Sequence, residues 1–137
     1  MQLKRINYQH LNAKQKETYN FQKVSAVLAE YGFSTIKLND DWQGSDFIAQ
    51  HIDGKVHLKV QLKGRLTFDK KYLNKNIYIC FRNNDQWYLY PHDKLLNKFL
   101  KSFSDSMAKS SSWMEKHGYS FSKLSVEHLK HLKAYQI

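Results

Sequence analysis

The chain has 137 residues, enough for one domain with a substantial hydrophobic core. Hydrophobic residues make up 42% of it and aromatic residues 15%, which excludes a disordered chain. No run approaches the ~18 consecutive apolar residues of a membrane helix, and the N-terminus lacks the apolar core of a signal peptide. The single cysteine, Cys80, excludes an internal disulfide and a cysteine-based zinc site. We therefore expect one domain over residues 1–137 of a cytoplasmic protein that does not contact a membrane.

The net charge of +10 lies in the second part of the chain. Residues 1–53 carry six Lys/Arg and six Asp/Glu, whereas residues 54–137 carry sixteen and six. Eight of those basic residues fall between Gly54 and Asn83, with one acid among them. A polyanion is the natural partner of such a field, so the charge favours nucleic acid over a surface that is basic for solubility alone.

The first predicted element is a helix that begins after Asn12 and stops at Gly32. Asn12 is a good N-cap, and Gln15, three residues later, completes a capping box. Apolar side chains then recur at helical spacing, at Phe21, Val24, Val27, Leu28 and Tyr31. Glu17 falls in line with them. It is either a helix-end residue that reaches solvent or an acid aimed into a site.

A strand over residues 32–38 and a turn-rich loop over residues 39–44 come next. The following segment predicts a hairpin, because Asp53-Gly54 stands between alternating apolar residues. With these two as the turn, Ile52 pairs with Lys55, and paired residue numbers sum to 107.

That register predicts a polar site on one face of the hairpin. Asp46 lies opposite Gln61, and cross-strand partners point to the same face. Lys63 follows on that face, because side chains alternate along a strand.

Two further strands, over residues 76–82 and 86–90, precede a helix that follows Pro91. Residues 102–122 are serine-rich and predict an irregular segment with a short helical piece around Trp113. Ser125 is placed to cap a last helix. This order predicts an α/β domain with a mixed central sheet of four to five strands, flanked by helices and followed by extra C-terminal helices.

An acid, an amide and a lysine on one strand face are typical of metal-assisted phosphodiester cleavage. Mg²⁺ or Mn²⁺ prefers oxygen ligands, usually one or two carboxylates with waters and substrate phosphate. Asp46 is the anionic ligand, Gln61 offers a side-chain oxygen, Leu62 a main-chain carbonyl and Glu17 a second carboxylate. Lys63 would orient or deprotonate the attacking water and offset charge on the phosphate.

The residues Gly44-Ser45-Asp46, the hairpin and Val60-Gln61-Leu62-Lys63-Gly64-Arg65, after a Glu-bearing helix, resemble the PD-(D/E)XK nuclease superfamily. The resemblance implies a restriction-endonuclease-like core of helix, three or four mixed strands, helix and strand. We match it to residues 12–101, with residues 102–137 as a helical extension. It implies catalytic roles for Asp46, Gln61, Lys63 and Glu17. Gly-Ser stands where the family name has Pro, and Gln61 where it has an acid.

The resemblance and the basic charge together imply a divalent-metal-dependent DNA endonuclease. We expect it to act on double-stranded DNA as a homodimer, because a two-fold pair places two sites on antiparallel strands. The residues expected to hold phosphates are Lys59, Arg65, Lys70, Lys71 and Arg82. Two alternatives stay open. One is a non-catalytic nucleic-acid-binding module with this fold, and the other is a basic module that binds an acidic protein.

Two other groups of residues carry weaker signals. His128 and His131 share a helix face, but no acid or cysteine completes a metal site, so a solvated face is the better interpretation. The aromatic run from Trp87 to Tyr90 could stack on bases, although alternating aromatic residues on a strand more often form core.

Overall fold

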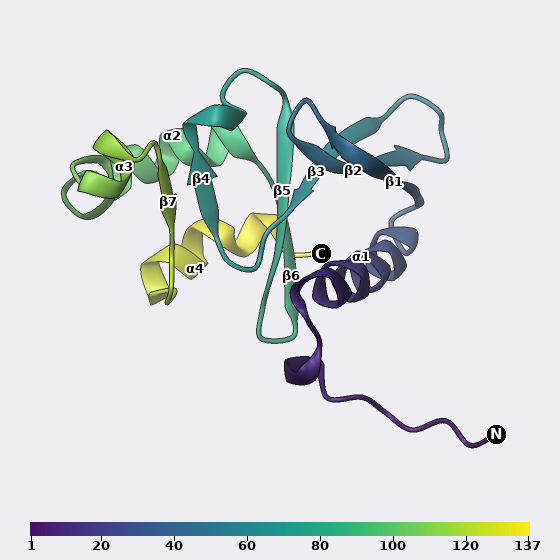
Figure 1. Cartoon of the computed structure of the whole chain (residues 1–137). Helices are drawn as coiled ribbons and strands as arrows, with labels where there is room; N and C mark the ends of the chain where they lie inside the picture. Colours follow the sequence, from purple (N-terminus) through teal and green to yellow (C-terminus); the bar gives the residue numbers. More distant parts are fainter.

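A mixed five-stranded sheet with strand order β1-β2-β3-β5-β6 forms the centre of the molecule (Figure 1). The computed structural model describes residues 1–137, apart from the side chains of residues 41 and 42. The strands of this sheet are β1 (Phe33–Trp42), β2 (Ser45–His51), β3 (His57–Leu62), β5 (Ile77–Asn83) and β6 (Gln86–Pro91). Only β3 and β5 pair in parallel. The predicted α/β class, with a mixed sheet of four to five strands flanked by helices, is confirmed.

Helix α1 (Ala13–Ala29) covers one face of this sheet (Figure 1). Its predicted capping box is present: the Asn12 side chain accepts the Gln15 N–H, and the Gln15 side chain accepts the Asn12 N–H. Val24 and Leu28 are buried against strand residues, as the apolar spacing predicts. Tyr31 is not part of that buried face, because it lies beyond the helix end and is 52% exposed.

The β2–β3 hairpin has the predicted register and a different turn. Phe47 lies opposite Val60, so paired numbers sum to 107. The loop has four residues and is closed by the His51 N–H donating to the Val56 carbonyl at 2.9 Å. The predicted two-residue turn is wrong, because the Asp53 side chain caps backbone N–H groups within a longer loop. Its carboxylate accepts the backbone N–H groups two and three residues later, at 2.8 and 3.3 Å.

The β1–β2 connection is shorter than the loop predicted for residues 39–44. Strand β1 continues to Trp42, with a register shift after Lys37, and its last residue pairs with Ser45. Only Gln43 and Gly44 remain as the turn, both in the left-handed region at φ 53° and 85°. Strand β1 therefore extends through residues whose polar composition suggested a loop, and pairing with β2 resumes at its last residue.

The second face of the sheet is covered by α2 (His92–Ser102) and the C-terminal elements (Figure 1). The serine-rich segment is more regular than predicted. It forms a π-helical turn (Ser104–Ala108), α3 (Ser111–Glu115) and strand β7 (Gly118–Ser120), and α4 (Val126–Leu132) follows. Met107, Trp113, Phe121 and Leu132 join the core beneath β5 and β6. Within the described residues, no helix is long and apolar enough to cross a membrane.

The crossover between the parallel strands β3 and β5 carries no α-helix. It contains β4 (Thr67–Asp69), which pairs with β7, and the 3-10 turn η2 (Lys70–Tyr72). The resemblance implied a strand after the second helix in the central sheet. Here, the strand after α2 is β7, and it belongs to the small β4–β7 sheet instead.

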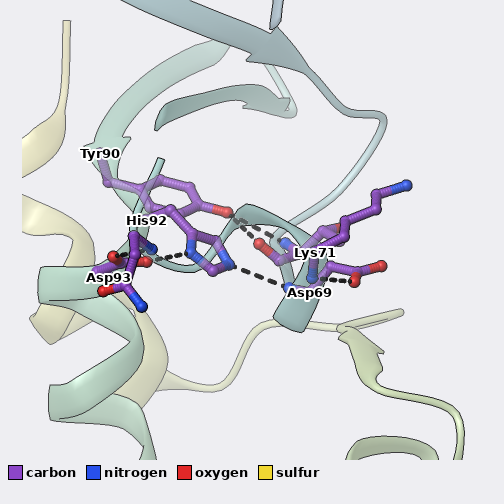
Figure 2. A network of polar contacts seen from close by, with 7 residues as sticks. Asp69, Lys71, Tyr90, His92 and Asp93 are labelled. Atoms are coloured by element: carbon purple, nitrogen blue, oxygen red, sulfur yellow. Dashed lines mark hydrogen bonds and ion pairs between the residues drawn. The ribbon is translucent and has the colours of Figure 1, made fainter. Parts of the chain in front are cut away.

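Two buried side chains fix β4 and η2 to the body of the protein (Figure 2). The Tyr90 hydroxyl donates to the Thr67 carbonyl at 2.6 Å and accepts the Thr67 N–H at 3.2 Å. His92, fully buried, accepts the Asp69 N–H on Nε2 at 3.0 Å. Nε2 is therefore unprotonated, and Nδ1 donates to the Asp93 carboxylate at 2.8 Å.

Burial lowers the pKa of His92 below its ordinary value, although the hydrogen bond to Asp93 opposes this effect. Because the unfolded chain then binds more protons than the folded one, stability rises with pH in this window. The contribution of neutral His92 is complete above about pH 6.5, the ordinary pKa of histidine, and is lost progressively as the pH falls below it.

We predict that His92→Gln lowers the free energy of unfolding by about 1–3 kcal/mol at pH 7.5, because the β4 anchor is impaired. From pH 7.5 to pH 5, the wild type should lose more stability than the variant, because the variant lacks the titrating group. Urea denaturation across this range measures both slopes. Parallel slopes would contradict the assigned role of His92.

Candidate functional site

Asp46, Gln61 and Lys63 lie together where β2 begins and β3 ends. Continuing the observed register by one step places Asp46 opposite Gln61, as predicted. Oδ2 of Asp46 accepts the backbone N–H of Leu62 at 2.8 Å, so its carboxylate is fixed against the end of β3. Phe47 and Val60, the neighbours in sequence, pack on the α1 side, so Asp46 and Gln61 point to the other side of the sheet. Lys63 lies just beyond the end of β3 and also lines a pocket beside α1.

Gln61 holds a buried oxygen without a partner. The residue is 8% exposed, and its Oε1 accepts no hydrogen bond from any described residue. A buried acceptor without a donor is costly, and such groups in folded proteins commonly mark an ion, a water or a functional site. The amide oxygen therefore has a free coordination position beside the Asp46 carboxylate.

Lys63 is positioned by both its backbone and its side chain. Its N–H donates to the Cys80 carbonyl on β5 at 2.9 Å, which fixes the residue at the end of the parallel pair. Its Nζ lies 5.6 Å from the centroid of the Tyr72 ring, and Lys71 Nζ lies 5.1 Å from the same ring. Tyr72 is buried and belongs to η2, so the crossover segment packs onto the site. The sequence carries no local signal for this contact.

Glu17 lies at the edge of the site, on α1. It lines a pocket with Leu62 and Lys63, but Asp46 and Gln61 are not among the residues that line this pocket. Its carboxylate is 43% exposed and lies 3.8 Å from the ammonium groups of Lys14 and Lys37. Of the two roles considered for this acid, the solvent-reaching one describes its present contacts, and a water molecule would have to connect it to Asp46.

The oxygen donors at this place fit a weakly bound Mg²⁺ or Mn²⁺. The donor set contains one carboxylate, the unpartnered Gln61 oxygen and main-chain oxygen at Leu62, which suits a hard cation that keeps several waters. Among the described side chains, no three Asp, Glu, His or Cys residues gather as a metal cluster. The set therefore carries little negative charge.

The predicted phosphate-binding residues fall into separate groups. Arg65 and Arg82 line a common pocket that continues from Gly64, next to Lys63. The ammonium groups of Lys71 and Lys63 both lie close to the Tyr72 ring. Two others lie apart from these pockets. Lys59 Nζ donates to the Gln43 side chain at 3.1 Å, and Lys70 Nζ stands 5.0 Å from the Trp113 ring.

The structure adds residues that the sequence did not single out. Tyr8, Lys16 and Asn20 line the pocket beside Lys63, together with Trp87. The first three come from the N-terminal turn η1 (Tyr8–His10) and from α1, which lie within residues 1–53, where the net charge is zero. Trp87, Tyr88 and Tyr90 are buried core residues, as alternating aromatic residues on a strand more often are, although Trp87, 7% exposed, also lines this pocket.

The side chains of His128, His131 and Cys80 pack against other residues of the protein and form no candidate site. His128 and His131 are partly exposed, and their rings pack on Phe99 and Phe103 at centroid distances of 4.6–5.8 Å. Burial lowers the pKa of His128, with a smaller effect from His131. Cys80 is fully buried, and burial raises the pKa of its thiol, so it remains an unreactive thiol.

No protein-family model matches the chain, and no curated protein matches it significantly in sequence. Among solved structures, the chain is similar to Hjc, a Holliday junction resolvase from Archaeoglobus fulgidus. The identity is 17% and the TM-score 0.47, over 57% of this chain and 74% of the resolvase. It is also similar to the bacterial homing endonuclease I-Ssp6803I, with 19% identity and a TM-score of 0.44, over 61% of this chain and 67% of the endonuclease.

Gly44 is required by packing beside the site. A Cβ atom there would lie 3.2 Å from the Tyr72 ring, in a backbone conformation with φ of 85° that disfavours other residues. Gly54 has a similar φ of 72°, but a Cβ atom on it would have no neighbour within 4 Å.

We predict that Gly44→Ala destabilises the protein by about 2–4 kcal/mol, through backbone strain and the clash with Tyr72. The matched variant Gly54→Ala should cost about 1 kcal/mol, because it carries only the strain. Chemical denaturation of both variants measures the difference. Equal losses of stability would contradict the close packing of Gly44 on Tyr72.

Proposed function

We propose that this protein is a divalent-metal-dependent endonuclease that hydrolyses DNA phosphodiester bonds. The observation that carries the proposal is the unpartnered oxygen of Gln61, buried in register with the Asp46 carboxylate and next to Lys63. The fold has no use of its own for this oxygen, whereas a hard cation needs such ligands. The residue types and order also follow the PD-(D/E)XK resemblance, which concerns nucleases.

Asp46 and Gln61 would hold the Mg²⁺ or Mn²⁺ ion, with the main-chain carbonyl of Leu62 as a third donor and Glu17 acting through water. When bound, the ion supplies Lewis-acid stabilisation of phosphate charge and lowers the pKa of a bound water. The hydrogen bond from Leu62 to Asp46 keeps one carboxylate oxygen in place, so little ordering is needed when the ion binds.

Lys63 would act on the reacting groups. Its Nζ donates a hydrogen bond that orients the attacking water, and its charge offsets the negative charge that develops on the phosphate. The Tyr72 ring restricts where this ammonium group can lie. Gly64, next in the chain, leaves open space, because a Cβ atom on it would meet nothing within 4 Å. A phosphate could approach the backbone there.

Contacts to the DNA backbone would come from the basic residues around the site. Arg65 and Arg82 line the adjoining pocket, and Lys71 lies beside the Tyr72 ring. Lys59 and Lys70 would contact phosphates further along the strand. Such contacts supply affinity without sequence preference. A homodimer would place two of these sites on the two strands of a duplex.

A second function is favoured by one specific observation. Gln61 brings no negative charge, and no cluster of three ionisable metal ligands occurs among the described side chains. A chain with this fold and a weak metal site could bind nucleic acid without cutting it. The remaining alternative, a basic module for an acidic protein, rests on the net charge alone.

We predict that the protein nicks plasmid DNA with Mg²⁺ or Mn²⁺, and that Asp46→Asn and Lys63→Met each slow cleavage by at least about 100-fold. The asparagine oxygen can still accept the Leu62 N–H, so Asp46→Asn removes the charge and keeps the strand contact. Gel assays of the nicked product give the rates.

Two exposed residues provide matched controls for this assay. Asp105→Asn and Lys130→Met change the same residue types on the surface, where the side chains are 91% and 68% exposed, and should leave cleavage unchanged. Full activity in both site variants would contradict the proposal. DNA binding without any cleavage by the wild type would favour the binding module. If binding is absent even at low salt, the acidic-protein alternative is favoured.

A further inference from the structure

We propose that the pocket beside Lys63 binds a single unpaired nucleotide of the substrate strand, next to the phosphate that is cut. This inference rests on the proposed nuclease function and adds the class of substrate: nucleic acid that presents an unpaired nucleotide. The pocket has a volume of about 450 Å³, and the residues that matter here are Tyr8, Lys16, Asn20, Lys63, Arg82 and Trp87.

The lining combines aromatic rings with cations, the two groups that a nucleotide engages. Lys16 Nζ and the Arg82 guanidinium carbon each lie 5.4 Å from the centroid of the Tyr8 ring. The same guanidinium carbon lies 5.6 Å from the Trp87 ring. A tyrosine ring or a planar guanidinium group stacks on a nucleobase of any sequence, and the ammonium groups suit its phosphate.

Tyr8 is held in place before any ligand binds. Its hydroxyl accepts a hydrogen bond from the Asn20 amide at 2.9 Å, and its ring packs on Tyr19 at 5.2 Å. The first residues of the chain extend away from the body of the molecule (Figure 1), and Leu3 is largely exposed. The N-terminal segment contacts the body through Tyr8, at this pocket, and through Ile6, which lines a separate pocket with residues of α1. An aromatic side chain fixed in advance loses little conformational freedom on binding.

The charge of the pocket also favours an anion. Lys16, Lys63 and Arg82 line it together with one acid, Glu17. The Glu17 carboxylate already faces two further ammonium groups outside this lining set, those of Lys14 and Lys37. The pocket thus has an excess of positive charge, which attracts a phosphate group.

The size and position of the pocket select one nucleotide. The pocket volume of about 450 Å³ falls within the ~300–1,000 Å³ range of small-ligand pockets. A pocket of this volume is too small for a base pair with both sugars. A base must therefore leave its stack, or already be unpaired, in order to enter. Lys63 belongs both to this pocket and to the proposed hydrolytic site, so the phosphate of the bound nucleotide would lie at the cleavage position.

The test measures binding in EDTA, where no cleavage occurs. One fluorescent duplex carries a single bulged 2-aminopurine, and its matched duplex has the same base paired with thymine. We expect the wild type to bind the bulged duplex about tenfold more tightly, and Tyr8→Leu to lose this preference, because stacking on one aromatic side chain has about this effect. Tyr8→Phe should keep the preference, since it retains the ring.

Tyr31→Leu is the matched control, because it removes a tyrosine that lies just beyond α1, away from the pocket, and is 52% exposed. It should bind both duplexes as the wild type does. Equal affinity of the wild type for the two duplexes would overturn the proposal, and so would the same loss of preference in Tyr8→Leu and Tyr31→Leu. Free dAMP that binds as tightly as the bulged duplex would also overturn it, in favour of a site for a free nucleotide.

The outcomes separate this proposal from the nuclease function. If plasmid cleavage depends on Asp46 and Lys63 but the bulge preference is absent, only the pocket assignment fails. If the preference is present and depends on Tyr8 while no DNA is cut, the chain is a binding module and the nuclease proposal fails.

Discussion

One hydrogen bond, from the Leu62 N–H to Oδ2 of Asp46, joins the start of β2 to the end of β3 at the point where the backbone pairing stops. The Asp46 carboxylate here accepts the Leu62 N–H in place of a main-chain carbonyl. This hydrogen bond fixes the carboxylate at the sheet surface, opposite Gln61 and next to Lys63. Every proposed role of these residues depends on this contact, because the same register with Asp46 turned away would leave no ligand set.

The crossover from β3 to β5 explains how the other side of the site is built. A parallel pair needs a long connection, usually an α-helix, and this chain uses β4 and η2 instead. The side chains of Tyr90 and His92 form hydrogen bonds to the backbone of β4. The η2 turn that follows β4 places the Tyr72 ring against Gly44 and Lys63. The lysine position is thus linked to a buried neutral histidine through packing. The C-terminal residues complete this arrangement through β7 and the core beneath β5 and β6.

Local chemistry predicted much of this structure. The Asn12 capping box, the hairpin register, the strand pair over residues 77–91 and the Ser125 cap each follow from side chains close in sequence. Contacts between distant segments did not. The strands β4 and β7 have three residues each, too few for an alternating pattern, and Tyr72 meets Lys63 only through the crossover. The Asp53 cap changed the turn without changing the register. The predicted two-residue loop and the observed four-residue loop have the same centre, so the strand residues pair in the same way.

The central claim is that Asp46 and Gln61 form a divalent-cation site, and titration of Mn²⁺ followed by electron paramagnetic resonance tests it most directly. The account predicts weak binding by the wild type, binding at least about tenfold tighter in Gln61→Glu, where a second carboxylate replaces the amide, and no binding at this site in Asp46→Asn. The same Mn²⁺ affinity in all three proteins would contradict it.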